Sequence, residues 1–265
     1  MGLPTGRERR QAIRFFLRAR CAAFSDSDTL EQGLKNMPRT ARASVGGLCY
    51  HVFNRGNAGA DVFRDARDYA EFVQLLQQAA DTRKVRLLAY CLLPDHFHLI
   101  LWPRKDGDLS QWMQWILTSH VRRYHRRYQT SGHIWQGRFR AFPIQPDEHL
   151  LIMLRFVEQN PLRLRELRIR KPERWLWSSV GKSSGSKDAA GLIRPRIEPG
   201  PVSRGRNWLK SVQRPITDVE LALARHSVVR GTPFGDPKWQ QRIVARLGLE
   251  STMRPRGRPR KMPTK

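Results

Sequence analysis

The sequence predicts an α+β fold with a ferredoxin-like core, in which helices cover one face of an antiparallel sheet. Between about residues 47 and 180, strand-like segments and segments whose apolar residues recur at helical spacing follow one another along the chain. Turn residues such as Asn54–Asn57 and Pro94–Asp95 separate these segments. The resulting order of elements is β-α-β-β-α-β-α, which is typical of such a core.

The individual elements follow from local patterns. In the first expected helix, Tyr69, Phe72 and Leu76 recur three and four positions apart, which places them on one face. Pro161 lacks an amide hydrogen and is expected to stop the last helix of the core. The expected elements, in chain order, are a strand at 48–53, a helix at 65–80, strands at 85–93 and 96–102, a helix at 109–128, a strand at 138–144 and a helix at 147–160.

The composition divides the chain into five parts. Residues 1–36 are polar and weakly patterned, so they are expected to be a disordered extension or to precede a natural start at Met37. Ser, Gly, Pro and Arg are frequent in residues 181–206, which indicates a linker. The expected parts are therefore the extension 1–36, the core domain 37–180, the linker 181–206, a small helical module at 207–250 that resembles DNA-binding modules, and a basic tail at 251–265.

The charge favours a polyanionic partner. The chain carries 49 Lys and Arg against 23 Asp and Glu, a formal net charge of +26. Counterions released from a nucleic acid would drive its binding to such a chain, although a ribosome-bound or membrane-surface protein could share this balance. There is no run of eighteen apolar residues, and Cys21, Cys49 and Cys91 suggest neither a metal knuckle nor a disulfide framework. A cytoplasmic protein that binds nucleic acid is the favoured interpretation.

Two histidines are candidates for a metal site. His96 and His98 are two positions apart on an expected strand, so they project from the same face, while Phe97 points into the core. Such a pair can chelate a divalent ion or polarise a phosphate, and it can equally be structural. Asn160 offers an oxygen that suits Mg²⁺ or Mn²⁺, and on a helix it would share a face with Phe156. The alternative is that Asn160 only ends the helix.

Basic and aromatic residues gather on the second expected helix. They are typical of a surface that binds phosphates and stacks on bases, although a solvated helix face has the same pattern. In the tail, Pro255–Pro259 is similar to an AT-hook, whose arginines enter the minor groove, or is a nonspecific basic segment. The candidate DNA-binding residues are Arg122, Arg123, Tyr124, Arg126, Arg127, Arg138, Arg140, Arg256 and Arg258.

Several short blocks together resemble the REP-associated tyrosine transposases, of the single-tyrosine HUH transposase superfamily. The block around His96-Phe97-His98 is similar to the HUH strand of that family, and residues 155–161 are similar to its last core helix. The order and spacing of the blocks make a chance agreement improbable. The similar blocks are 37–39, 50–57, 90–100, 132–139, 155–161 and 175–179, followed by 233–236 and 247–252.

The resemblance implies a mechanism. His96, His98 and Asn160 would hold a divalent ion, Mg²⁺ or Mn²⁺, against a phosphate of single-stranded or hairpin DNA. In the family a tyrosine four residues before the last ligand attacks this phosphate and forms a 5′-phosphotyrosine, while a 3′-hydroxyl leaves. The bacterial cytoplasm, at the nucleoid, would be the location, and the resemblance leaves open whether the protein is a monomer or a homodimer.

The chain departs from the family at the nucleophile. Phe156 stands at the tyrosine position and has no hydroxyl, so it cannot form the covalent link. Either the chain does not cleave DNA, or Tyr124 or Tyr128 on the preceding helix takes over. Three functions therefore remain: a transposase that cleaves and transfers strands, a DNA-binding derivative that does not, and an unrelated metallohydrolase or ribosomal accessory protein.

Overall fold

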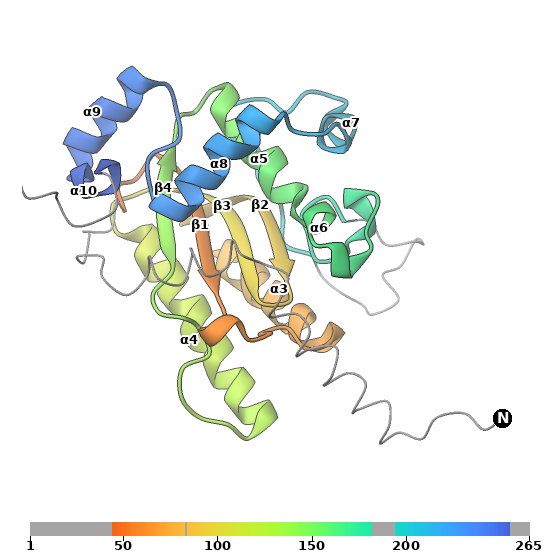
Figure 1. Ribbon diagram of the computed structural model, residues 1–265. Coiled ribbons are helices and arrows are strands. Elements are labelled where there is room, and N and C mark those ends of the chain that lie inside the picture. The colour runs from red at the N-terminus through yellow and green to blue at the C-terminus, as the bar shows by residue number, and fades with distance from the viewer. Residues whose placement is uncertain (1–43, 83, 182–193, 255–265) are drawn as a thin grey trace, which may run out of the picture. The chain divides into compact units, whose positions relative to one another are not determined.

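The computed structural model describes residues 44–82, 84–181 and 194–254. Within them, the chain up to Met253 forms one compact unit (Figure 1). The expected extension 1–36, and the tail segment with Arg256 and Arg258, lie outside the described residues. No helix among the described residues is both long and apolar enough to cross a membrane.

The centre of the unit is a four-stranded antiparallel sheet. Its strands are β1 (Cys49–Arg55), β2 (Val85–Leu93), β3 (His96–Pro103) and β4 (Arg140–Ile144). They lie in the order β2-β3-β1-β4, so the chain crosses over β3 on its way from β1 to β2. This order is that of a ferredoxin-like sheet, and the predicted α+β fold class is confirmed.

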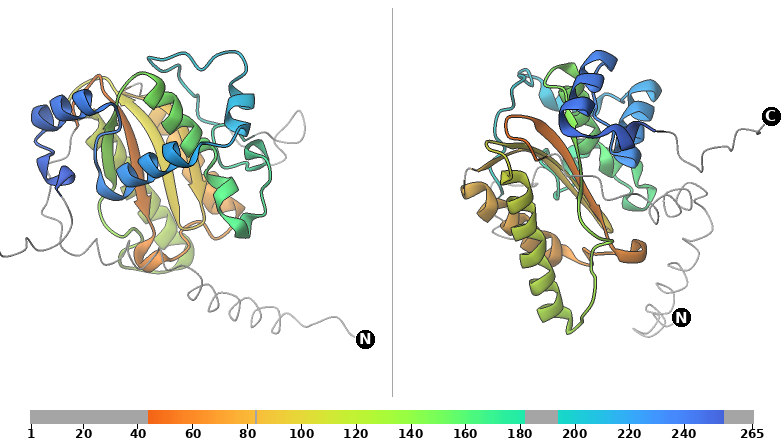
Figure 2. Two further views of the ribbon diagram at one scale, coloured as in Figure 1. Left: turned by 45° about the horizontal axis from the view of Figure 1, so that its top comes forward. Right: turned by 90° about the vertical axis from the view of Figure 1, so that its left-hand side faces the viewer.

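Helices cover both faces of the sheet, so the expectation of a single covered face is wrong (Figure 2). On one face, α3 (Ala66–Asp81) and α4 (Asp108–Tyr128) pack over Phe97, Leu99 and Leu101 of β3. On the other face, α5 (Glu148–Glu158) packs over Ile100 of the same strand. The reason is visible in β2 and β3, whose residues are apolar on both sides, because a sheet of this kind needs a cover on each face.

The last helix of the core differs from the prediction near its end. A single helix through Asn160 was expected, but α5 ends at Glu158 and a second short helix, α6 (Asn160–Arg163), follows. Pro161 lies in the first turn of α6, where the missing amide hydrogen costs nothing, and so it opens a helix instead of stopping one. Asn160 therefore lies at the start of α6, and Gln159 between the two helices keeps helical dihedral angles.

The C-terminal residues pack against the core within the same unit. The backbone of Phe234 joins the edge of the sheet, where its amide donates to the carbonyl of Pro143 at 2.9 Å. In the segment predicted to be a linker, the amide of Glu198 donates to the carbonyl of Leu87 at 2.9 Å, while residues 182–193 lie outside the described residues. The helices here are α7 (Trp208–Gln213), α8 (Asp218–Arg230), α9 (Pro237–Leu247) and α10 (Glu250–Met253).

This C-terminal segment holds the end of α5. Glu158 is fully buried, and its carboxylate accepts hydrogen bonds of 2.7 Å from Ser179 Oγ and from Trp208 Nε1. Gln159 donates from Nε2 to the carbonyls of Val212 and Arg214, both at 2.6 Å. The position of α5 thus depends on residues that come about fifty positions later in the sequence.

Candidate functional site

His96 and His98 lie side by side on β3, on the face that α5 covers. Their ring centroids are 5.1 Å apart. The ring of Phe53, opposite His98 in the β1–β3 register, contacts both, with centroids 5.6 Å from His96 and 5.0 Å from His98. The strand geometry therefore brings the two imidazoles together as their spacing of two predicts.

A third histidine, which the sequence reasoning missed, completes the group. His51 on β1 is fully buried, and its Nε2 lies 2.9 Å from Nδ1 of His98. Its ring stacks on Phe142 with centroids 4.8 Å apart. Burial lowers the pKa of His51 to about 3, and burial followed by the neighbouring His51, His96 and Arg163 lowers that of His98 well below its usual value. Both rings are therefore neutral, and the contact is a hydrogen bond between one donor and one acceptor.

The hydrogen bonds leave one ring nitrogen of each strand histidine for a further ligand. Nδ1 of His96 lies 2.5 Å from Oδ1 of Asp95, a carboxylate that also accepts from Arg55 Nε at 3.0 Å. Burial alone would raise the pKa of Asp95, but the hydrogen bond and charge of His96 and the charge of Arg55 outweigh it and hold the pKa at about 2. With Nδ1 engaged in both His96 and His98, Nε2 is the free atom on each ring. This is the usual arrangement of metal-ligating histidines.

Phe156 lies beside these rings. Its side chain is buried, and it meets His98 edge-on with centroids 5.8 Å apart. Arg163 of α6 places its guanidinium 4.8 Å from the Phe156 centroid and donates from Nη1 to the Phe156 carbonyl at 2.9 Å. Burial, followed by the nearby Arg225, lowers the pKa of Arg163 to about 10, so the guanidinium stays charged at neutral pH. A permanent positive charge therefore lies next to the histidine pair.

Asn160 is the remaining predicted ligand. It is buried at the start of α6, and its Nδ2 has no hydrogen-bond partner. Because Nδ2 is a donor, its missing partner would be an acceptor such as a phosphate oxygen, whereas the amide oxygen is the atom that could bind an ion. The donor set, two imidazole nitrogens and one amide oxygen, suits a divalent ion.

Among the described residues, one other group of His and acidic side chains lies close enough to share an ion. Its members are Asp147, Glu148 and His149, at the beginning of α5. Asp147 caps this helix by accepting from the amide of His149 at 2.9 Å, and the same oxygen lies 2.8 Å from His149 Nδ1. Helix capping accounts for this group.

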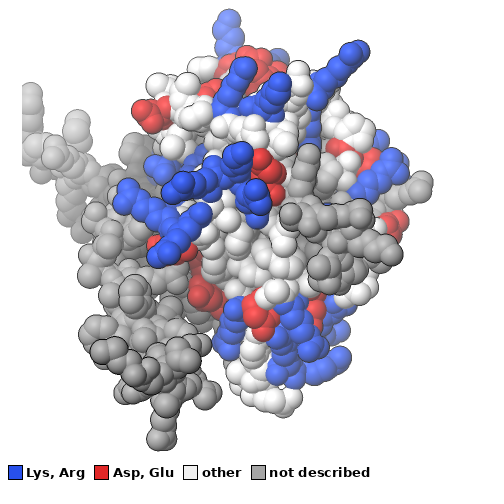
Figure 3. Space-filling view, turned by 90° about the vertical axis from the view of Figure 1, so that its right-hand side faces the viewer, with Lys and Arg blue, Asp and Glu red and all other residues white. Residues whose placement is uncertain are grey.

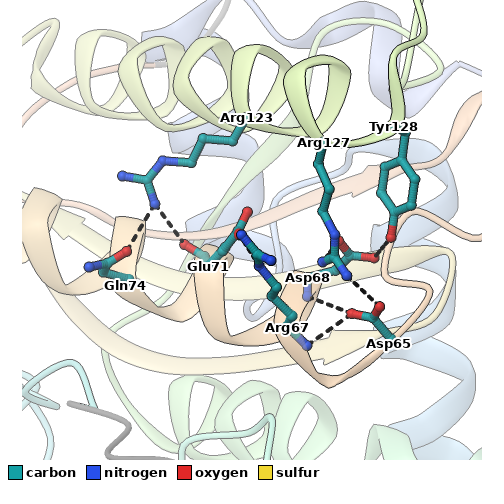
Figure 4. A network of polar contacts seen from close by, with 8 residues as sticks. All are labelled: Asp65, Arg67, Asp68, Glu71, Gln74, Arg123, Arg127 and Tyr128. Atoms are coloured by element: carbon teal, nitrogen blue, oxygen red, sulfur yellow. Dashed lines mark hydrogen bonds and ion pairs between the residues drawn. The ribbon is translucent and has the colours of Figure 1, made fainter.

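On α4, several of the predicted DNA-binding side chains are used inside the protein (Figure 4). Arg127 pairs with Asp65 at 2.5 Å and with Asp68 at 2.7 Å. Arg123 donates to the side chains of two glutamines of α3. Tyr124 is buried, so its ring is not available to stack on a base. For Arg123, Tyr124 and Arg127 the structure thus shows a role in packing α4 on α3, whereas Arg122, Arg126 and Arg138 are exposed and Arg140 is half-buried.

The two tyrosines of α4 cannot reach the histidine pair. Tyr128 donates from its hydroxyl to Asp68 at 2.7 Å, and α4 packs on the face of the sheet that carries Phe97. His98 points to the opposite face, toward Phe156. The sheet therefore separates these hydroxyls from His98, which argues against the alternative that one of them replaces the missing nucleophile.

Comparison with known protein families identifies one that matches part of the chain. Residues 44–160 match the family of IS200-like transposases. This stretch contains the whole four-stranded sheet, the histidines, Phe156 and Asn160. This part of the chain is therefore similar to that family.

Individual proteins are similar to the chain as well. A protein of Haemophilus influenzae described as a REP-associated tyrosine transposase is 28% identical over 104 residues, which cover 35% of this chain and 58% of the relative. A solved structure of a REP-associated tyrosine transposase bound to a REP hairpin is 16% identical, with a TM-score of 0.44 over 60% of this chain and 98% of that one. A protein of Deinococcus radiodurans assigned as a transposase is 18% identical, with a TM-score of 0.32 over 46% of this chain and 97% of that one. The resemblance of the chain to the REP-associated tyrosine transposases is confirmed.

Proposed function

We propose that the chain binds single-stranded or hairpin DNA in the bacterial cytoplasm and holds one phosphate of it at His96, His98 and Asn160. The observation that carries this proposal is the pair of imidazoles whose Nδ1 atoms are both engaged in hydrogen bonds, so that Nε2 of each is free. Phe156, which the resemblance places at the position of the family's tyrosine, packs against His98 of this pair. This arrangement supports a site that handles phosphate and in which the nucleophile is replaced.

The donor types of the three residues, two imidazole nitrogens and one amide oxygen, are ones that a divalent ion accepts. Mg²⁺ or Mn²⁺ bound there would neutralise phosphate charge and stabilise the departing oxygen. The protein's own part is to orient the ligands through His51 and Asp95 and to add the charge of Arg163 beside the phosphate. These groups favour binding of the phosphate whether or not a strand is cleaved.

Strand cleavage needs an oxygen that Phe156 lacks. In the family reaction, a tyrosine oxygen bonds to phosphorus, the bond to the 3′ oxygen breaks, and that oxygen leaves as a hydroxyl after taking up a proton. Without the hydroxyl no covalent intermediate forms, so the chain is a DNA-binding member of a transposase family that keeps the site and lacks the nucleophile. The unaltered protein is expected to bind DNA without cutting it.

The test is an adduct assay with a hairpin oligonucleotide that carries a single-stranded flank, in the presence of Mg²⁺ or Mn²⁺. The unaltered protein should bind it and give no covalent adduct on a denaturing gel, whereas Phe156→Tyr should give one. The adduct should disappear in the double variant Phe156→Tyr with His98→Ala. An adduct formed by the unaltered protein, or no binding of the oligonucleotide by any variant, would refute the proposal.

A further inference from the structure

A run of unpaired cations follows α6 directly, and we call it the basic ridge. Five basic side chains within residues 165–174 are exposed, and in the described part of the chain none of them makes a side-chain hydrogen bond or ion pair. The acidic residues of the same stretch are Glu166 and Glu173, and Glu173 accepts a hydrogen bond from Gln213 Nε2 at 2.9 Å. The ridge consists of Arg165, Arg168, Arg170, Lys171 and Arg174.

The ridge contrasts with the other basic cluster of the chain. On α4 the charges of Arg123 and Arg127 are directed at α3, where Asp65 and Asp68 neutralise Arg127 (Figure 4). On the ridge no carboxylate takes this role, so the charge is available to a partner in solution. Lys and Arg side chains also stand out on the side of the molecule that carries α6 and α7 (Figure 3).

The ridge is continuous with the candidate site. It begins two residues after Arg163, whose guanidinium lies over Phe156, and five residues after Asn160. The backbone is ordered into two short helical turns, η3 (Arg165–Leu167) and η4 (Pro172–Arg174), which pack against α6. A group of exposed cations that begins this close in sequence to a phosphate site can contact several phosphates of one nucleic-acid strand.

We propose that the basic ridge binds the phosphodiester backbone of the DNA strand that leads to the histidine site. The proposal rests on the proposed function and names the surface that the strand follows outside the site. Phosphates are the expected partner because the ridge offers charge without an exposed aromatic side chain for stacking on bases. It therefore contributes affinity that does not depend on base sequence.

The test compares two triple variants of the full chain that remove equal charge. Arg165→Gln, Arg168→Gln and Arg170→Gln weaken the ridge. Lys84→Gln, Arg104→Gln and Lys105→Gln serve as the control, since these exposed residues lie at the end of β2 and β3 away from His96. Both are titrated with a fluorescent hairpin that carries a ten-nucleotide single-stranded flank, with the hairpin alone, and with the flank alone, at several KCl concentrations.

Losing three phosphate contacts should lower the salt slope of log K by about 2 and weaken binding at 0.1 M salt about ten- to hundredfold. The control variant should keep the slope and affinity of the unaltered protein. The three DNA probes identify the part of the DNA that the ridge contacts. A loss of affinity for the flank alone places the ridge on single-stranded DNA, and a loss of affinity for the hairpin alone places it on the stem. An unchanged salt slope in the ridge variant, with DNA binding intact, would refute DNA binding by the ridge and leave the proposed function standing. If the unaltered protein does not bind the DNA at all, the proposed function itself is refuted.

Discussion

His51 offers the sharpest test of the candidate site, because it contacts no ligand and acts only through His98. For Nε2 of His98 to bind a metal ion, the proton of this neutral ring must be on Nδ1 and must be donated to Nε2 of His51, 2.9 Å away. In His51→Leu this acceptor is lost within a fully buried environment. The His98 ring then avoids an unpaired buried N–H by placing its proton on Nε2, the atom that the metal needs.

The expected loss follows from the role of such supporting hydrogen bonds. Removing the partner of a metal-ligating histidine typically lowers metal affinity about 10- to 100-fold. In His51→Gln the side-chain oxygen can still accept from His98 Nδ1, so most of the affinity should return. The free energy of unfolding should fall by about 1–3 kcal/mol in the Leu variant, since one buried polar atom of His98 loses its partner.

The measurement is a Mn²⁺ titration of the full chain, followed by electron paramagnetic resonance of the free ion, with nitrogen NMR of the imidazoles to read the His98 tautomer. His120→Leu is the matched control, because His120 is equally buried, has a pKa that burial lowers to about 3, and packs with Phe72 on the other face of the sheet. Unaltered Mn²⁺ affinity in His51→Leu would refute the positioning role. No Mn²⁺ binding by the unaltered protein would refute the metal site as a whole.

Two further predictions concern the buried carboxylates of Asp68 and Glu158. In Asp68→Asn the free energy of unfolding should fall by about 1.5–3 kcal/mol in urea titrations, because the buried carboxylate accepts from Arg127 and Tyr128 at 2.7 Å each, while DNA affinity stays unchanged. A large loss of DNA affinity at unchanged stability would show instead that this cluster contacts DNA. Burial raises the pKa of Glu158 above its usual 4.5, against the opposing effects of Arg204, Ser179 and Trp208, so the folded state holds this proton more tightly than the unfolded chain. The stability that Glu158 contributes is therefore complete below pH 4.5 and is lost as the pH rises through the pKa of the folded state. In Glu158→Gln this part of the pH dependence of the free energy of unfolding should disappear. An identical pH profile in the variant would contradict this prediction.

The sequence predicted the strands and the histidine pair correctly where neighbouring residues alone determine the structure. The apolar residues of 85–93 and 96–102 and the tight turn between them predicted β2 with its observed bounds and β3 to within one residue. The spacing of two placed His96 and His98 on one face of β3, as the structure shows. His51 was missed because its role depends on β1 pairing with β3, which brings together residues 47 positions apart. A signal was nevertheless present, since His51 is a polar residue on the apolar strand β1 and alternates with Tyr50 and Val52, which pack on the other face.

The basic residues of α4 and of the ridge show why charge in a sequence does not by itself locate a binding surface. Residues 122–128 contain no acid, so the pattern predicts a free cationic face, yet the carboxylates that bind Arg127 come from Asp65 and Asp68, about sixty residues earlier. The ridge looks less promising, because Glu166 and Glu173 interrupt it in the sequence. In the fold Glu173 accepts from Gln213, and no ridge cation is paired within the described residues. The electrostatic field at a surface depends on which charged side chains the fold brings together. Here the carboxylates of Asp65 and Asp68 neutralise part of the basic cluster on α4, whereas the cations of the ridge stay unpaired near the proposed phosphate site.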